Sequence, residues 1–396
     1  MSKATALRII YFLVFCCTGA WLPKLYDYCI YHGLTGSQSA LILSITPIMM
    51  FAVQPIYGFM ADKLGYKKTL LISTLLASIS YWGFLYNGGF SWLVIVTIVM
   101  SLFYNTIQPV LDSMALQIAK DNPEFSYGSL RFYGAAGFAF TTIITGQVID
   151  AVDITVIFIV SAITMFLAFL FSFLLKDEVH DLPADRQGKA VANAYSNVWT
   201  VLKNRSLLFL LFCVFLVSAG ATTIWNFYSA YLKENGASDS LVGYGLSFQG
   251  LCELPIFYFS ARIILRLGLK TTLIITVLAT VVRMLLYHFI KTPVTTLPVE
   301  LLHGFSWSLF WVVCVEYVNK LVDERWLVTG QSLLYAAYFG IGAIAGNYWT
   351  QYFLDKGYKV ADVFLINAGV VTIVVALLWV FMKKDGITKN NFTYNE

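Results

Sequence analysis

The sequence predicts an all-α polytopic membrane protein whose twelve transmembrane helices form two six-helix bundles. Three observations lead to this prediction. Of the 396 residues, 59% are hydrophobic and only 12% are charged, whereas a soluble domain carries about 25% charged residues. The apolar residues gather in twelve runs of roughly the 20 residues that cross a bilayer. A short sequence also recurs at equivalent places in the two halves of the chain.

Twelve apolar stretches are long enough to span a bilayer as helices. The first is too long for the apolar core of a signal peptide and lacks a small-residue cleavage site, so we interpret it as a retained helix. The expected spans cover residues 7–30, 38–61, 69–87, 90–118, 128–150, 153–175, 206–232, 241–264, 271–290, 295–319, 329–354 and 361–382.

The longest polar stretch lies between the sixth and seventh spans and divides the chain. We expect an N-terminal six-helix bundle (1–175), a cytosolic central loop (176–205), a C-terminal six-helix bundle (206–384) and a cytosolic tail (385–396).

The recurring sequence reads LGYKKTL at 64–70 and LGLKTTL at 267–273. Each copy follows the second span of its half. This placement predicts two parallel copies of one bundle, related by an axis along the membrane normal.

Lysine and arginine residues indicate which loops face the cytosol. With the N-terminus in the cytosol, 20 of the 26 basic residues lie on the inner side, five lie outside, and Arg283 falls within a span. We therefore expect a multi-pass protein of the cell membrane with both termini in the cytosol. The net charge of +4 is small and spread over loops, which gives no indication of a nucleic-acid partner.

The sequence carries no pattern typical of an enzyme, a cofactor site or a metal site. The six cysteines lie mostly in apolar segments without Cys-x-x-Cys spacing, as is typical of packing residues. No nucleophile elbow and no phosphate-binding loop is evident. We predict neither catalysis nor a bound cofactor.

Five ionisable residues lie inside apolar spans: Asp112, Arg131, Glu253, Arg283 and His303. A charged side chain near the middle of a bilayer costs about 2.5–3.5 kcal/mol on insertion scales. Such residues pair with one another or face a water-filled path, which makes these five the first candidates for a functional site.

The segment QPIYGFMADKLGYKK after the second span resembles the loop signature of the major facilitator superfamily. Gly58 permits close helix approach, Asp62 lies at a helix end, and Gly65, Lys67 and Lys68 form a basic turn. In the superfamily this loop latches the two halves on the cytosolic side. The resemblance implies a gating loop; a purely structural turn is the alternative.

Further segments resemble the lactose permease branch of the superfamily, with its phenylpropionate and nucleoside proton symporters. In FSYGSLRFYG, Arg131 falls on the sugar-binding arginine of helix 5, and Asp112 lies near its partner acid on helix 4. Glu253, Arg283 and His303 match the acid of helix 8, the arginine of helix 9 and the histidine of helix 10. The resemblance implies that these three couple transport to protons, whereas the first two bind substrate or form an ion pair.

Three features depart from the lactose permease pattern. Ser306 stands in place of the helix 10 acid, Phe138 in place of the stacking tryptophan, and the acid–lysine pair between helices 7 and 11 has no counterpart. These departures move the coupling role toward Glu253, with Arg283 as its expected counter-ion. Glu300, also on helix 10, can share a face with His303 at i, i+3 spacing, and solvation at the outer end of the helix is the alternative.

Helical spacing places more polar and aromatic side chains on shared faces. Amides beside aromatic rings suit a ring-bearing solute such as a sugar, a nucleoside or an aromatic acid, although packing between helices is the alternative for each residue. Near the outer mouth, Lys24 and Asp27 form either a gate or a surface pair. The expected substrate-binding set is Asn105, Gln108, Asp112, Arg131, Phe138, Trp225, Asn226, Gln249, Trp307 and Tyr335.

The sequence thus predicts a secondary active transporter that carries a small polar ring-bearing solute, with a sugar or oligosaccharide favoured, together with protons by alternating access. The alternatives are an exporter or uniporter of amphipathic or aromatic compounds, a nucleoside symporter, and a non-transporting membrane sensor. The expected partners are the substrate, protons and the lipid bilayer, and we expect a monomer.

Overall fold

The computed structural model describes residues 3–121, 127–175, 201–323 and 326–382. Within these ranges, some helical positions are described by their backbone alone. They are residues 3, 51–63, 116–117, 119–121, 127–129, 131 and 327–328.

Six membrane-spanning segments form the N-terminal half. The first consists of α1 (Lys3–Trp21), the turn η1 (Leu22–Lys24) and α2 (Leu25–Tyr31). The others are α3 (Gly36–Leu64), α4 (Tyr66–Trp82) with η2 (Gly83–Leu85), α5 (Gly89–Asp121), α6 (Tyr127–Ala151) and α7 (Val156–Ser172).

Six more segments form the C-terminal half, and two of them are interrupted. The seventh to ninth are α10 (Arg205–Glu234), α11 (Asp239–Leu267) and α12 (Leu269–Phe289). The tenth consists of η3 (Pro293–Leu302), η4 (Gly304–Leu309) and α13 (Phe310–Leu321). The last two are α14 (Leu327–Tyr335) with η6 (Ala336–Gly342) and α15 (Ala343–Asp355), and α16 (Val360–Phe381).

These segments match the twelve predicted spans one to one, which confirms the all-α membrane fold class. Among the described residues, nine helices are long and apolar enough to cross a membrane. The second and sixth segments contain shorter apolar helices, Gly36–Met50 and Val156–Ser172.

The tenth span departs from the single helix predicted at 295–319. Pro293 and Pro298 both fall in η3, a 3₁₀ helix, and proline cannot donate the backbone hydrogen bond of a regular α-helix. The next segment, η4, is π-helical, a form that occurs mostly as single turns and often at functional sites. His303 lies at the junction of η3 and η4.

The predicted internal repeat is visible in the backbone. Gly65 and Gly268 begin the third helix of each half with φ of +83° and +82°, a left-handed conformation that glycine adopts without a steric penalty. Four positions later, the hydroxyl groups of Thr69 and Thr272 donate to the carbonyl oxygens of these glycines. The two turns are therefore copies of one structure.

Buried aromatic side chains repeat in the same way. The hydroxyl of Tyr28 donates to the carbonyl of Phe84, and that of Tyr231 donates to the carbonyl of Tyr287, in each case 56 positions along the chain. Tyr231 also meets Phe364 edge-on, with ring centroids 5.2 Å apart. The pattern supports two parallel copies of one bundle.

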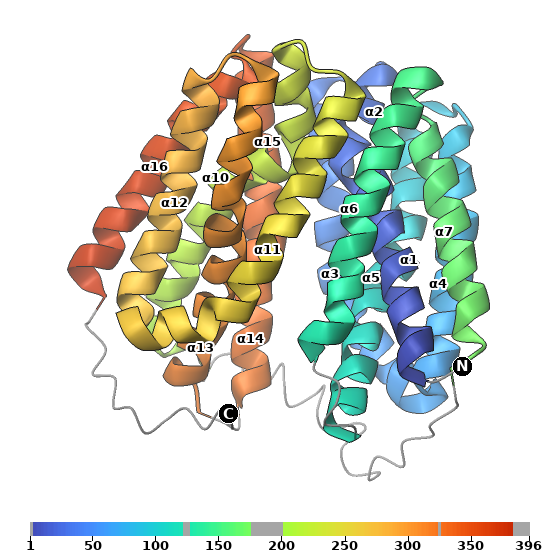
Figure 1. The fold of residues 1–396 in the computed structure, drawn as a ribbon, viewed down its shortest axis with the longest axis horizontal. Coiled ribbons are helices and arrows are strands. Elements are labelled where there is room, and N and C mark those ends of the chain that lie inside the picture. Colours follow the sequence, from blue (N-terminus) through green and yellow to red (C-terminus); the bar gives the residue numbers. More distant parts are fainter. Residues whose placement is uncertain (1–2, 122–126, 176–200, 324–325, 383–396) are drawn as a thin grey trace.

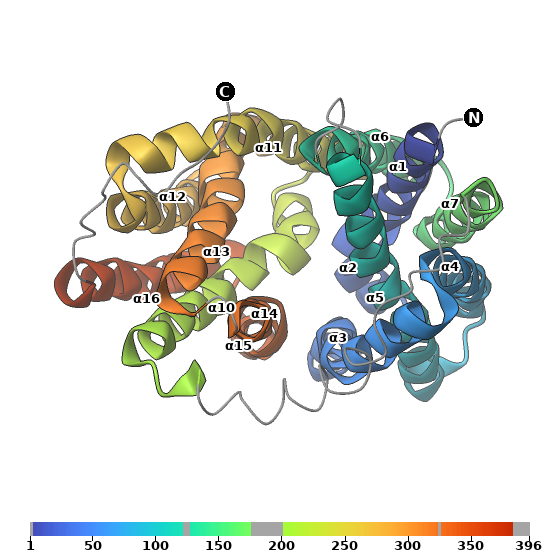
Figure 2. The same cartoon turned by 90° about the horizontal axis from the view of Figure 1, so that it is seen from below.

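The two halves stand side by side, with the N-terminal half in blue to green and the C-terminal half in yellow-green to red (Figure 1). Helix α6 contacts α11, and α3 contacts α15. Seen from below, these two pairs lie at opposite ends of the boundary between the halves (Figure 2). Helix α1 begins and α16 ends at the lower side in Figure 1.

Candidate functional site

A cluster of charged side chains lies buried within the C-terminal half. Arg283, on α12, is at its centre and is 2% exposed. Its Nη2 donates to Oε2 of Glu300 over 2.5 Å, and its Nη1 lies 2.8 Å from Nδ1 of His303. Its Nε donates to the hydroxyl of Tyr287 over 2.9 Å. The guanidinium is therefore held on three sides.

Glu300 belongs to the cluster and does not lie in solvent at the outer end, which was the alternative for it. It is fully buried rather than solvated, and it forms the ion pair with Arg283 that was expected of Glu253. Its Oε1 accepts hydrogen bonds from the hydroxyls of Tyr228 and Tyr287 over 2.8 and 2.7 Å. Glu300 lies in η3, which contains Pro293 and Pro298. Its position three residues before His303 was the sequence feature that could have indicated its place in the cluster.

His303 joins Arg283 to Glu253. Its Nε2 lies 3.0 Å from Oε1 of Glu253, and the ring of Trp225 meets it edge-on with centroids 5.3 Å apart. Glu253, on α11, is 22% exposed, whereas the other three members are almost fully buried. The structure therefore brings the three predicted coupling residues into one chain of contacts, with Glu253 at its accessible end. We call Glu253, Arg283, Glu300 and His303 the buried cluster.

An aromatic wall stands next to the buried cluster. Trp225 meets Trp307 edge-on at 5.0 Å between ring centroids, and Trp307 stacks on Trp311 at 5.8 Å. Nε1 of Trp225 donates to the hydroxyl of Tyr338, and Tyr335 packs edge-on against Trp311. Three predicted substrate-binding residues, Trp225, Trp307 and Tyr335, thus belong to one surface.

The two predicted amides of the C-terminal half differ in their contacts. Nδ2 of Asn226 donates to Oδ1 of Asn347, whose own Nδ2 donates to the hydroxyl of Ser44 on α3. These hydrogen bonds join the two halves, so Asn226 contributes to packing between helices, which was the alternative to substrate binding. Gln249 is 4% exposed, and its amide nitrogen has no hydrogen-bond partner within the described part of the chain.

The predicted Asp112–Arg131 pair lies partly outside the described residues, because the side chain of Arg131 is not described. Asp112, on α5, is half-buried and accepts a hydrogen bond of 2.6 Å from the hydroxyl of Tyr11 on α1. Seven positions earlier on α5, Nδ2 of Asn105 donates to the carbonyl of Thr46 on α3. Both contacts stay within the N-terminal half.

Two other predicted residues of the N-terminal half are half-buried. Gln108 lies between Asn105 and Asp112 on α5, and their spacing places the three residues on one face of the helix. Phe138, on α6, packs between the halves: a Cβ on Gly19 of α1 would lie 2.9 Å from its carbonyl oxygen, and a Cβ on Gly250 of α11 would lie 3.6 Å from its ring.

The predicted gating loop is described only in part. Gly58 and Asp62 lie where the backbone alone is described. Gly65 makes the left-handed turn into α4, Lys67 is half-buried and Lys68 is exposed.

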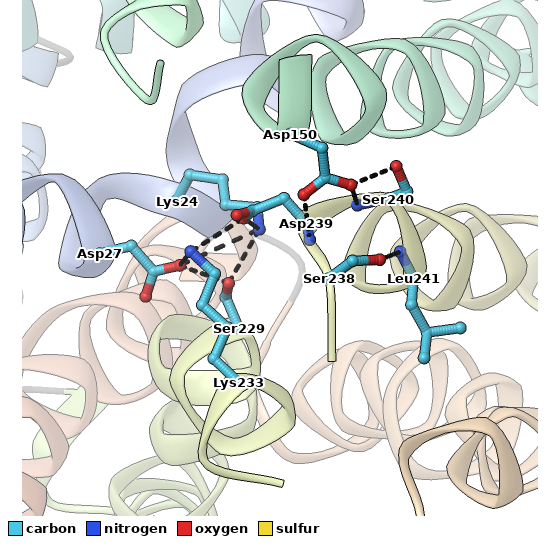
Figure 3. Close-up of polar contacts among 9 residues, drawn as sticks. All are labelled: Lys24, Asp27, Asp150, Ser229, Lys233, Ser238, Asp239, Ser240 and Leu241. Carbon is cyan, nitrogen blue, oxygen red and sulfur yellow. Dashed lines mark hydrogen bonds and ion pairs between the residues drawn. The ribbon is translucent and has the colours of Figure 1, made fainter. Parts of the chain in front are cut away.

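A second charged cluster joins the two halves at the upper ends of the helices (Figure 3). Lys24, on η1, is 3% exposed, forms an ion pair with Asp239 of α11 and donates to the hydroxyl of Ser229 on α10. Nζ of Lys233 lies 3.1 Å from Oδ2 of Asp27 and 2.9 Å from Oδ1 of Asp239. Each lysine thus contacts an aspartate of the opposite half. We call Lys24, Asp27, Lys233 and Asp239 the interface cluster.

Asp150 of α6 extends this contact by capping α11 from the other half. Its carboxylate accepts hydrogen bonds of 2.8 Å from the backbone N–H groups of Asp239 and Ser240 (Figure 3). A negative charge at the N-terminus of a helix is stabilising. The sequence alone indicated Lys24 and Asp27 but not their partners, because Lys24 is 205 and 215 positions away from Ser229 and Asp239.

Within the described ranges, no three His, Cys, Asp or Glu side chains are arranged to hold a metal ion. All six cysteines are free, and five of them are buried. Their surroundings are those of packing residues.

Comparisons with known proteins agree with this architecture. The profile of the MFS_1 like family matches residues 4–366. The chain is 25% identical to "Maltose permease" of Geobacillus stearothermophilus over 97% of its length and 95% of that protein. It is 26% identical to "Probable 3-phenylpropionic acid transporter" of Escherichia coli (strain K12), over 79% of this chain and 81% of that one.

Solved structures share the fold. The crystal structure of the nucleoside transporter NupG superimposes with a TM-score of 0.83 at 18% identity, covering 97% of this chain and 100% of that one. An auto-inhibited POT family peptide transporter superimposes with a TM-score of 0.73 at 12% identity, over 99% of both chains.

Proposed function

Because the chain belongs to the MFS_1 like family and is a secondary active transporter of the major facilitator type, we propose that it carries a small polar ring-bearing solute together with protons. Sugars and oligosaccharides are the favoured substrate class. The observation that carries the proposal is the contact chain from Arg283 through His303 to Glu253, which ends at a partly exposed carboxylate.

Glu253 has the properties that proton coupling requires. It is the most accessible member of the buried cluster, and among the described side chains His303 is the one that bonds to it. It can therefore bind a proton when water reaches it and release the proton when its surroundings change. In a membrane, an ionisable side chain of this kind is the natural element of a proton path.

The aromatic wall supports the substrate class. Trp225 lies next to His303 and Trp307 lies next to Trp225, and aromatic faces with a few polar groups are typical of small-molecule sites. A ring would lie against an indole while its hydroxyl groups bond to Glu253 and to the amide of Gln249. The relatives named for maltose, melibiose, sucrose and raffinose favour a sugar.

Alternating access would use the interface cluster. In the present state this cluster holds the upper ends of the halves together. We propose that the lower side, where α1 begins, faces the cytosol, in line with the distribution of lysine and arginine. The contacts of Lys24 and Lys233 would then break when the outer side opens.

The test is proton uptake during substrate entry. Adding a transported sugar to de-energised cells that express the protein should make the medium more alkaline. E253Q should abolish accumulation against a gradient but retain exchange of internal for external substrate. E316Q is the matched control, since Glu316 is a half-buried acid of the same half and should accumulate substrate normally. Full accumulation by E253Q would remove Glu253 from the mechanism.

A nucleoside symporter is the second candidate, favoured by the close superposition on NupG. A thermal-shift screen of sugars, nucleosides and aromatic acids with purified protein separates the candidates, because a bound ligand raises the melting temperature. Stabilisation by nucleosides alone would replace sugars in the proposal. Efflux of aromatic compounds without proton uptake would favour an exporter.

A further inference from the structure

The contacts of His303 determine which of its ring nitrogens carries the hydrogen. A guanidinium has five N–H donors and no acceptor, so Nδ1 of His303, which lies 2.8 Å from Nη1 of Arg283, must be the acceptor. Nε2 then carries the hydrogen and donates it to Oε1 of Glu253, 3.0 Å away. A doubly protonated ring would point an N–H group at the guanidinium. The arrangement therefore fits the neutral ring alone.

Glu300 fixes the guanidinium that imposes this tautomer. It holds Nη2 of Arg283 at 2.5 Å, and Tyr287 both accepts from Nε of Arg283 and donates to Glu300. Tyr228 adds a second hydroxyl donor to the same carboxylate. With both charges buried, turning Arg283 away would leave Glu300 unpaired in an apolar surrounding, which is strongly unfavourable. Nη1 of Arg283 is thereby kept against His303.

The ionisable groups around the cluster come from four packed elements. Tyr228 and Tyr231 come from α10, Cys252 and Glu253 from α11, Arg283 and Tyr287 from α12, and Tyr338 from η6. The charges of Arg283 and Glu300 cancel. With His303 neutral, the cluster carries one net negative charge, that of Glu253. A proton bound to Glu253 brings the net charge of the cluster to zero.

We infer that Glu300 is a positioning residue for proton coupling: through Arg283 it keeps His303 in the neutral Nε2–H tautomer, so that Glu253 receives the proton. The meaning of this arrangement for transport rests on the proposed function. The tautomer itself does not, because it can be measured without substrate or transport.

The first experiment is ¹⁵N NMR of full-length protein with labelled histidines in detergent micelles or nanodiscs. The chain has four histidines, and the resonances that H303N removes identify His303. We expect an unprotonated Nδ1 and a protonated Nε2 from about pH 5 to pH 8, the range in which an ordinary histidine titrates. A doubly protonated His303 at neutral pH would overturn the inference.

The second experiment replaces Glu300. In E300Q, Arg283 loses its counter-ion and can turn to Glu253, which frees Nδ1 of His303. We expect His303 to titrate near neutral pH, and the pH profile of substrate-driven proton uptake to move toward acid by about one unit, since a nearby opposite charge favours the carboxylate form by that much or more. E316Q should change neither readout.

Y287F keeps every charge of the cluster and removes a single hydroxyl. It is the second variant for this test and replaces E300Q if E300Q does not fold. We expect shifts in the same directions but smaller. An unchanged tautomer and an unchanged pH profile in Y287F and E300Q would refute the role of Glu300. Proton uptake that is absent from the wild type, with the tautomer as inferred, would instead refute symport and leave the positioning of His303 standing.

Discussion

The buried cluster and the interface cluster each contain four ionisable side chains but have opposite relations to the two halves. The interface cluster combines two lysines with two aspartates, whereas the buried cluster combines two glutamates with Arg283 and a neutral His303. The buried cluster is drawn from α11, α12 and the tenth span, all within the C-terminal half. The interface cluster takes Lys24 and Asp27 from the first span and Lys233 and Asp239 from α10 and α11.

This difference indicates what each cluster can respond to. Movement of one half against the other leaves the buried cluster intact, so its state changes through protonation. The interface cluster must break whenever the upper ends separate. The basic residues of the two clusters fit these two roles. The planar guanidinium of arginine, in the buried cluster, holds fixed partners, whereas lysine, in the interface cluster, is a flexible point charge that can break and re-form contacts.

The largest expected effect comes from breaking the buried pair. Arg283→Leu leaves Glu300 fully buried without its counter-ion, and losing one partner of such a pair destabilises a fold by about 3–5 kcal/mol. We expect a strongly lowered melting temperature for the purified variant in detergent.

The double variant R283L/E300L is the control for this prediction. It removes both charges and should recover most of the lost stability, because no buried charge remains unpaired. A melting temperature of R283L equal to that of the wild type would mean that the buried cluster does not depend on Arg283–Glu300 pairing, and the contrast between the clusters would lose its basis.

The sequence was sufficient for the fold and for three of the four members of the buried cluster. Length and hydropathy located all twelve spans, and the repeated LG-x-K turn predicted the two copies. The missed pairing of Glu300 with Arg283 has a local cause: a regular helix was predicted here, whereas the segment contains two prolines and is a 3₁₀ helix followed by a π-turn. Periodicity assumes 3.6 residues per turn and cannot place side chains across such a break.

The interface cluster was beyond prediction for a different reason. Lys233 and Asp239 lie near the ends of their helices, where charged residues are ordinary. Only the packing of the halves brings them to Lys24 and Asp27. Contacts between halves depend on the conformational state of a transporter, and a single sequence contains no signal for one state.

An intermediate effect is expected from reversing one charge of the interface cluster. Lys24→Asp places a third acid beside Asp27 and Asp239, so the present state should become less populated. A tenfold change, about 1.4 kcal/mol, is a moderate expectation for a two-state equilibrium. Spin labels at the exposed upper-side residues Val152 and Val294 should report longer distances.

The exchange variant K24D/D239K restores one contact of opposite charges and should bring the short distances back. Lys291→Asp is the matched control, since Lys291 is exposed near the same end and bonds within its own half to the carbonyl of His288. If K24D and K291D changed the distances equally, the effect would reflect net charge and not the contact between halves.

The smallest expected effect concerns Asp150, which contacts the other half through the backbone N–H groups of Asp239 and Ser240 and the hydroxyl of Ser240. Asp150→Asn removes the charge that favours a helix N-terminus and leaves one acceptor oxygen, whereas the two oxygens of Asp150 accept separately from the N–H groups of Asp239 and Ser240. At an exposed position this charge contributes about 0.5 kcal/mol, so the labels should show a roughly twofold shift toward longer distances. Asp153→Asn is the control, because Asp153 accepts from Tyr31 and Thr155 of its own half. If D150N shifted the distances as much as K24D, the helix cap would be the main contact between the upper ends and the interface cluster a minor one.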